Sequence, residues 1–122
     1  MNEIYLTDNF KLSEFESPDT KEVKVDESLV AKLEVLRKAL DDKPLVINSG
    51  YRTVEHNKEV GGSPKSQHLK GKASDIARVD GFTVDEMKDK AEAVGFDGIG
   101  TYSWGIHVDV RGYKARWDYR KE

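Results

Sequence analysis

The two residues best placed to do chemistry are His68 and Asp75, seven positions apart. A neutral imidazole nitrogen and a carboxylate oxygen are both good zinc ligands. On one straight strand, an odd separation would place the two side chains on opposite faces. Gly71 lies between them and has no Cβ to oppose a turn with positive φ. We therefore expect the chain to bend at Gly71 and to bring both side chains to one point.

The apolar run that Asp75 begins, residues 75–79, predicts a strand that would hold the carboxylate rigidly. Asp75 could instead be a helix cap or a turn residue. Two ligands do not make a metal site, so a third must come from elsewhere in the chain.

A third candidate ligand, His107, lies in the alternating segment 105–111. Apolar and polar residues alternate there, which is typical of a strand with one face on the core. The core face would carry Ile106, Val108 and Val110, and the other face His107, Asp109 and Arg111. The remaining histidine, His56, lies in a polar helical segment, and we expect it to have a surface role.

His68, Asp75 and His107 would together form a set of two histidines and one aspartate. Three protein ligands leave zinc a fourth position for water, as in catalytic zinc sites. A lone histidine on a strand is more often a partly exposed side chain, so only the combination indicates a metal site.

Two amphipathic helices are predicted to support these segments. Residues 26–40 carry apolar side chains three and four positions apart, with Asp26 or Ser28 as cap. A second helix begins at Thr83 in a capping box with Glu86 and ends at Gly95.

The segments between the helices predict short strands and irregular structure. Strands are expected at residues 44–49, 98–102 and 106–111, and a short helix from Thr53 to Val60. Residues 1–25 are expected to be irregular, with Phe10, Leu12 and Phe15 on the core. The tail from Lys114 to Glu122 is polar, and we expect Trp117 and Tyr119 to lie back on the body.

Length and composition limit the classes of protein to consider. The 122 residues predict a single domain, 1–122. The net charge is −3 with scattered basic residues, which argues against nucleic acid as a partner. There is no cysteine, so any metal must be held by His, Asp or Glu. Residues 1–5 lack signal-peptide features, and no apolar run approaches membrane-spanning length.

The combined motifs resemble the zinc D-Ala-D-Ala carboxypeptidases and their Hedgehog-like relatives, in particular the small single-domain branch of phages, prophages and bacterial cell-wall enzymes. The core of the resemblance is Ser66-x-His68-x-x-Gly71-x-Ala73-x-Asp75 followed by Ile106-His107-Val108-Asp109. Further matches are Ser49-Gly50-Tyr51-Arg52-Thr53, Asn57-x-x-Val60-Gly61-Gly62, Gly98-Ile99-Gly100-x-Tyr102 and Arg116-Trp117.

This resemblance implies an α+β fold, with a small antiparallel sheet and two main helices. It implies Zn²⁺ as cofactor, with His68, Asp75 and His107 as ligands. Arg52 matches an arginine that binds substrate or the polarised carbonyl oxygen. Ser66 matches a serine that orients a ligand from outside the metal's own shell.

The implied function is hydrolysis of peptidoglycan stem peptides at a bond involving a D-amino acid, by zinc-activated water. The enzyme would be a D-Ala-D-Ala carboxypeptidase or a cross-link endopeptidase. We expect a monomer with no nucleic-acid or membrane partner. Without a signal peptide, it would reach the cell wall as a phage or prophage lysis enzyme (an endolysin) after release through a membrane lesion.

The general base is the point at which the sequence departs from these relatives. Several carry an acid three positions before the last histidine, where this chain has Trp104, and others a histidine at the position of Gly105. Asp109 is the first candidate base, because it shares a strand face with His107. Alternatively, Asp109 holds Arg111 or orients a ligand imidazole.

Two other functional classes follow from the same residues. The missing acid would also fit a catalytically inactive, zinc-containing module that binds the cell wall. His107-x-Asp109 also imitates half of the metal triad of non-haem iron oxygenases, but no histidine follows His107 to complete it.

Overall fold

The longest helix is α1 (Glu27–Ala39) in the computed structural model, which describes residues 2–120. It begins at Asp26, whose carboxylate accepts a hydrogen bond from the Ser28 amide at 2.8 Å. Of the two predicted caps, Asp26 is therefore the one used. The predicted apolar stripe is buried, and its residues are Leu29, Val30, Leu33 and Leu36.

The buried stripe of α1 can be tested with two substitutions on the same helix. Leu33→Ala should lower the free energy of unfolding by about 2–5 kcal/mol, because Leu33 is fully buried in the core. Val35→Ala should change it by roughly 0.5 kcal/mol or less, because Val35 is 54% exposed. Urea denaturation measures both, and equal effects would contradict this packing.

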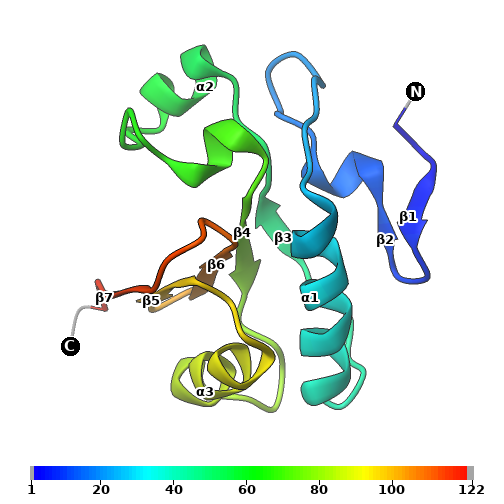
Figure 1. Cartoon of the computed structure of the whole chain (residues 1–122), viewed down its shortest axis with the longest axis vertical. Helices are drawn as coiled ribbons and strands as arrows, with labels where there is room; N and C mark the ends of the chain where they lie inside the picture. The colour runs from blue at the N-terminus through cyan, green and yellow to red at the C-terminus, as the bar shows by residue number, and fades with distance from the viewer. Residues whose placement is uncertain (1, 121–122) are drawn as a thin grey trace.

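The second main helix, α3 (Val84–Val94), begins in the predicted capping box. The Glu86 amide donates to the Thr83 hydroxyl, and the Thr83 amide donates to the Glu86 carboxylate. The helix ends at Gly95, as expected. Figure 1 shows α1 and α3 side by side, with the short α2 (Val54–Glu59) at the far end of the molecule. The predicted cap of α2, Thr53, accepts from the His56 amide.

The main sheet has five strands in the spatial order β3-β4-β6-β5-β7. Their bounds are Ile47–Ser49 for β3, Ala73–Ala77 for β4, Gly98–Tyr102 for β5, Gly105–Asp109 for β6 and Ala115–Asp118 for β7. Neighbours are antiparallel except β5 and β7, which are parallel. The predicted α+β class, with a small antiparallel sheet and two main helices, is confirmed. The sheet also contains an edge strand that was not predicted, β7, which is parallel to β5.

One face of this sheet packs on α1 and α3 and forms the core. The sheet residues in this cluster are Ile76, Ile99, Ile106 and Val108, all fully buried. Because side chains alternate along a strand, the residues between them lie on the opposite face. That opposite face carries His107 and Asp109, as the alternation of the sequence predicts.

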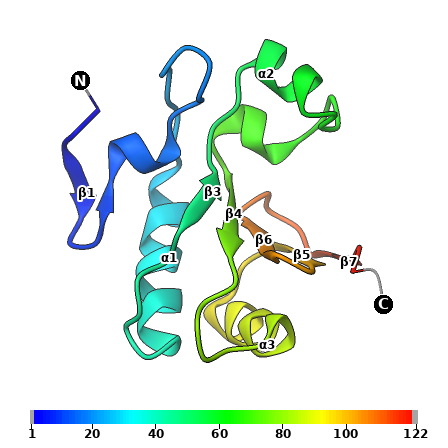
Figure 2. The same cartoon turned by 180° about the vertical axis from the view of Figure 1, so that it is seen from behind.

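Several predicted bounds were wrong in detail. The strand predicted at 44–49 begins only at Ile47, the strand at 75–79 is shifted to β4, and the strand at 106–111 is β6. Residues 1–25 are not wholly irregular: they hold the hairpin β1 (Tyr5–Thr7) and β2 (Phe10–Lys11) and the 3-10 turn η1 (Leu12–Phe15). Figure 2 shows this hairpin on the outer side of α1. Within residues 2–120, no helix has the length and apolarity that crossing a membrane requires.

Candidate metal centre

One row of residues crosses all five strands of the sheet on the face away from the helices. Each residue in the row is the cross-strand partner of the next one, from β3 through β4, β6 and β5 to β7. In spatial order the row is Ser49, Asp75, His107, Gly100 and Trp117. Asp75 and His107 are therefore cross-strand partners, and Asp75 is a strand residue rather than a cap.

His68 reaches this row from the 3-10 turn η2 (Gln67–Lys70), which precedes β4. The turn ends at Gly71 in the left-handed region, with φ of 69°. The predicted bend is thus present, and it folds His68 back over the beginning of β4. Gly71 is also tightly packed, because an added Cβ would meet the Lys24 carbonyl. Glycine is required here for both reasons.

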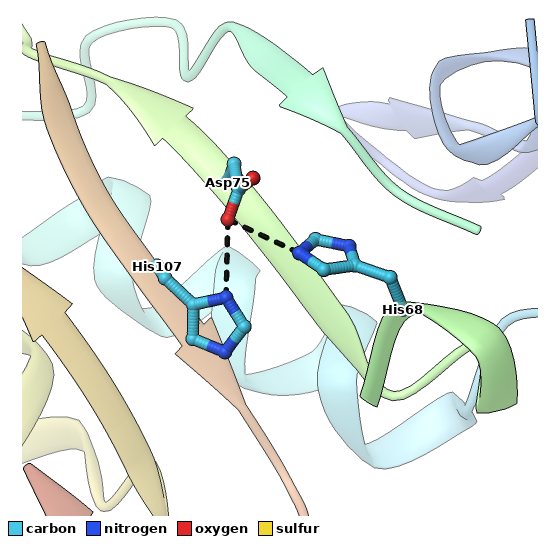
Figure 3. A group of neighbouring side chains, drawn as sticks. All are labelled: His68, Asp75 and His107. Carbon is cyan, nitrogen blue, oxygen red and sulfur yellow. Dashed lines mark hydrogen bonds and ion pairs between the residues drawn. The ribbon is translucent and has the colours of Figure 1, made fainter. Parts of the chain in front are cut away.

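The three predicted ligands converge on one point, as Figure 3 shows. Asp75 Oδ1 lies 3.2 Å from His68 Nε2 and 3.1 Å from His107 Nδ1. The three donor atoms all lie within 4.8 Å of one another. Ligand atoms of a tetrahedral zinc, with bonds of about 2.0–2.2 Å, are about 3.3–3.5 Å apart. The spacing therefore fits a zinc ion after a small adjustment.

The outer nitrogen of each imidazole is already bonded, which fixes where the lone pairs point. His68 Nδ1 donates to the Gly50 carbonyl at 2.7 Å, and His107 Nε2 donates to Asp109 Oδ2 at 2.7 Å. In its neutral form, each imidazole therefore turns its remaining lone pair toward Asp75 Oδ1. Two lone pairs facing a carboxylate oxygen repel one another unless a cation lies between them. The donor set thus fits a divalent metal.

The electrostatics of the cluster also favour positive charge at this point. Burial raises the pKa of Asp75, but the His107 and His68 rings outweigh it when they carry a proton in the absence of metal, and they hold that pKa well below its usual range. Burial lowers the pKa of His107, but the carboxylates of Asp109 and Asp75 outweigh it and raise that pKa. Two ionised carboxylates therefore flank the His107 ring.

Asp109 is fully buried, and its hydrogen bonds are taken by protein groups. Besides His107, it accepts from the Gly98 amide at 3.0 Å and from the Arg111 amide and guanidinium, the shortest at 2.7 Å. Burial raises its pKa, but bonds from His107 and Arg111 outweigh this and keep it ionised. This geometry favours the second of its two expected roles, which is to orient the His107 ring.

Two glycines of β5 make room for these side chains. Gly98 lies opposite Asp109, and Gly100 lies opposite His107. A Cβ at Gly98 would overlap the Asp109 carboxylate, and one at Gly100 would overlap the Trp117 indole. In the segment Gly98-Ile99-Gly100, the isoleucine side chain therefore lies in the core. The two glycines leave space on the opposite face of the sheet for Asp109 and Trp117.

Gly98→Ala should therefore disturb the metal centre from a neighbouring strand. We expect it to lower the free energy of unfolding by about 1–3 kcal/mol, as overpacking does, and to weaken zinc binding. Ser103→Ala, at an exposed position just beyond β5, is the matched control. Thermal unfolding and zinc titration test this; a Gly98→Ala protein with unchanged zinc affinity would contradict the packing of Asp109.

The metal centre opens into a cavity of about 700 Å³. One wall is the loop after α2, with Gly62, Ser63 and Lys65. Another part of the lining is aromatic, and its residues are Tyr102, Trp104, Tyr113, Trp117 and Tyr119. A smaller hollow of about 410 Å³ beside the β1 hairpin contains no histidine. The large cavity is thus the one that gives a ligand access to the three donor atoms.

Comparison with known sequences decides the family. A profile of the peptidase M15 family matches residues 7–110, which is most of the chain and includes all three candidate ligands. The chain belongs to the peptidase M15 family. It is also 44% identical over 45 residues to a zinc D-Ala-D-Ala carboxypeptidase of Streptomyces albus G. That match covers 37% of this chain and 18% of the relative.

Arg52 lies beside the metal centre of this M15 chain, as the resemblance implies. Its Nη2 donates to Asp75 Oδ2 at 3.3 Å, its Nε to Ser49 Oγ at 3.1 Å and its Nη1 to Asn57 Oδ1 at 3.3 Å. The guanidinium lines the cavity, and it also holds the carboxylate oxygen that faces away from the histidines. Arg52 can therefore fix Asp75 and present its remaining N–H groups to a ligand.

Ser66 and His56 lie where the sequence places them. Ser66 caps η2, and its hydroxyl accepts from the His68 amide at 3.2 Å, so it holds the backbone of a ligand residue. His56 lies on α2 with its Nδ1 3.8 Å from Glu59, outside the three-residue cluster.

The aromatic wall is the part of the site that sequence reasoning did not assign. Tyr102 and Trp117 belong to two of the motifs that resemble the carboxypeptidase family, and this was the signal in the sequence that could have identified them. Their residue types alone did not indicate a role. Trp104 occupies the position of the missing acid, and its ring stacks on Tyr102 at 4.7 Å. The residue that replaces the acid thus forms part of the cavity wall.

Proposed function

We propose that this chain is a zinc-dependent peptidase that hydrolyses peptidoglycan stem peptides at a bond involving a D-amino acid. The observation that carries the proposal is the convergence of two imidazole lone pairs and one carboxylate oxygen at an open cavity. Membership of the M15 family and the partial match to a zinc D-Ala-D-Ala carboxypeptidase support it.

His68, Asp75 and His107 would hold the zinc ion. When bound, zinc supplies Lewis-acid polarisation of a carbonyl group and acidification of a water molecule. Three protein ligands leave a position open for this chemistry. Asp109 and the Gly50 carbonyl keep the two imidazoles in the required tautomers and orientations.

Arg52 would bind substrate in addition to holding Asp75. A guanidinium suits a carboxylate or a polarised carbonyl oxygen, because it donates several parallel hydrogen bonds. Lys65 adds a further positive charge at the cavity wall, where the third basic residue, Arg111, is paired with Asp109. A free terminal carboxylate of a stem peptide would match these charges and favour carboxypeptidase activity. Endopeptidase activity is the alternative within the same proposal.

One observation favours a second candidate function, a cell-wall-binding module without activity. Asp75 is the one carboxylate that lines the cavity within residues 2–120, and it is taken up by the metal centre. A separate acidic group to accept a proton from water is absent from that lining. The module would hold zinc and bind peptidoglycan, but would not cleave it.

Digestion of purified peptidoglycan tests both candidates. The zinc-loaded protein is incubated with sacculi of several wall chemotypes, and released fragments are identified by mass spectrometry. We expect either free D-Ala or separated stem peptides, which distinguishes carboxypeptidase from endopeptidase. His68→Ala should release neither, whereas His56→Ala should match the wild type. Binding without products, with zinc in place, would establish the module instead.

The proposal includes a place of action and an assembly state. We propose that the protein acts as a monomer on the bacterial cell wall. Light scattering during size-exclusion chromatography measures the assembly state, and a mass near 13.8 kDa is expected. A stable dimer would contradict this part of the proposal.

A further inference from the structure

Tyr102 lines the cavity on the same sheet face as the metal centre. Gly98, Gly100 and Tyr102 alternate along β5, and Ile99 between them is in the core. Gly100 pairs with His107, so Tyr102 lies one step further along the face that carries this ligand. On this face of β5, Tyr102 follows two glycines. It is therefore the one residue of the three that has a side chain over the site.

Three aromatic residues hold the phenol ring of Tyr102 in place. The Trp104 ring stacks on it, with centroids 4.7 Å apart and planes 15° apart. The ring of Tyr119 contacts it edge-on at 5.8 Å. The indole Nε1 of Trp117 donates a hydrogen bond to its oxygen at 2.8 Å. The hydroxyl therefore has a fixed position at the wall of the cavity.

That position is close to the metal centre. The Trp117 indole lies over Gly100, so close that a Cβ there would overlap its Nε1. The same indole contacts the His107 ring, with centroids 4.9 Å apart. The Tyr102 hydroxyl is thus separated from the ring of a candidate ligand by one indole group.

The hydroxyl hydrogen of Tyr102 is a hydrogen-bond donor that is not used within the described residues. An indole N–H can only donate, so the phenol oxygen is the acceptor in its bond with Trp117. Within residues 2–120, the hydroxyl hydrogen has no acceptor at hydrogen-bond distance. Burial raises the pKa of Tyr102, so the phenol remains protonated at neutral pH. A rigid, neutral O–H group therefore faces the cavity with nothing to bind.

We propose that Tyr102 is a catalytic residue whose hydroxyl donates a hydrogen bond to the oxygen of the scissile amide carbonyl as that oxygen gains charge. This inference rests on the proposed peptidase function. Water supplies OH to the carbonyl carbon and H to the departing amine as the C–N bond breaks, and Tyr102 keeps its own proton. A preorganised donor of this kind stabilises the transition state more than the substrate.

The roles of its neighbours follow from this assignment. Trp104 and Trp117 are positioning residues, because they hold the ring and the oxygen of Tyr102. Arg52 gives three of its five N–H groups to Ser49, Asn57 and Asp75, so it keeps two for a ligand, and Tyr102 would add a further donor. The two donors would approach the carbonyl oxygen from different residues of the cavity wall.

Tyr102→Phe removes the hydroxyl and retains the ring. On the bond identified by the digestion experiment, we expect kcat to fall about 100-fold, with KM and zinc stoichiometry unchanged within threefold. Tyr5→Phe, which removes an exposed hydroxyl on β1, should behave as the wild type.

Calorimetry of a bound inhibitor gives a readout that does not depend on turnover. A phosphinate analogue of the cleaved dipeptide carries tetrahedral, anionic oxygens like those of the transition state. Its affinity should fall about 100-fold in Tyr102→Phe, whereas the affinity for the reaction product should change by less than threefold. A structural role would weaken both ligands equally.

The outcomes separate this inference from the proposed function. An active wild type whose Tyr102→Phe variant retains kcat and phosphinate affinity would overturn the role of Tyr102 and leave the peptidase function intact. Loss of zinc from Tyr102→Phe would make Tyr102 a structural residue and would also overturn the inference. A zinc-loaded wild type that cleaves no bond would overturn both.

Discussion

His107→Ala should abolish peptidoglycan cleavage and weaken zinc binding by more than 100-fold. Loss of an outer hydrogen-bond partner of a metal ligand typically costs about 10- to 100-fold in affinity, and loss of the ligand itself should cost more. His107 supplies one of three converging donor atoms and is 7% exposed, so no other described side chain can take its place without a rearrangement.

Competition with a chromophoric zinc chelator measures this change. His56→Ala is the matched control, because it removes an imidazole from the surface helix α2 and leaves the three-residue cluster intact. Equal zinc affinities for the two variants would show that the metal is held elsewhere.

Asp109→Ala should weaken zinc binding about 10- to 100-fold and also lower the free energy of unfolding by about 3–5 kcal/mol. The carboxylate is fully buried and receives hydrogen bonds from His107, Gly98 and Arg111, so its removal leaves three donors without an acceptor. The His107 ring would then lose the bond that fixes its tautomer.

The same variant separates the two roles that the sequence allows for Asp109. A residue that orients His107 must affect zinc affinity, which chelator competition measures, and stability, which urea denaturation measures. A general base would lower kcat alone, with zinc affinity unchanged. Asp118→Asn, at an exposed carboxylate of β7 paired with Arg120, controls for the loss of one negative charge.

The convergence of the three candidate ligands could be predicted because each of them is positioned by local sequence. The left-handed bend at Gly71 joins His68 to β4, and the alternation of residues 105–109 places His107 on the polar face. The cap at Asp26 and the capping box at Thr83 are likewise local, since both depend on residues within one turn. Contacts between residues that are close together in the chain can be predicted from a single sequence.

The burial of Asp109 could not be predicted because it depends on a neighbouring strand. Alternation shows that Asp109 shares a face with His107, but not whether that face is open to water. Gly98 on β5 lets the carboxylate be buried, and Arg111 supplies the positive charge that it needs there. The Gly98-Ile99-Gly100 pattern was the available signal for this arrangement.

The strand β7 was missed for a similar reason. Residues Ala115–Asp118 lack the alternation of a half-buried strand, and they pair with β5 in parallel at the edge of the sheet. This pairing brings Trp117 over Gly100 and completes the wall that holds Tyr102. The register between distant strands, which no local pattern encodes, thus determines the aromatic part of the cavity wall.

The measurement that tests the metal centre most directly is anomalous diffraction at the zinc edge from crystals of the zinc-loaded protein. We expect one strong peak within about 2.0–2.2 Å of His68 Nε2, Asp75 Oδ1 and His107 Nδ1. His107 Nε2 should remain bonded to Asp109. Zinc at another position, or zinc bound through His107 Nε2, would show that the three side chains do not form the metal centre described above.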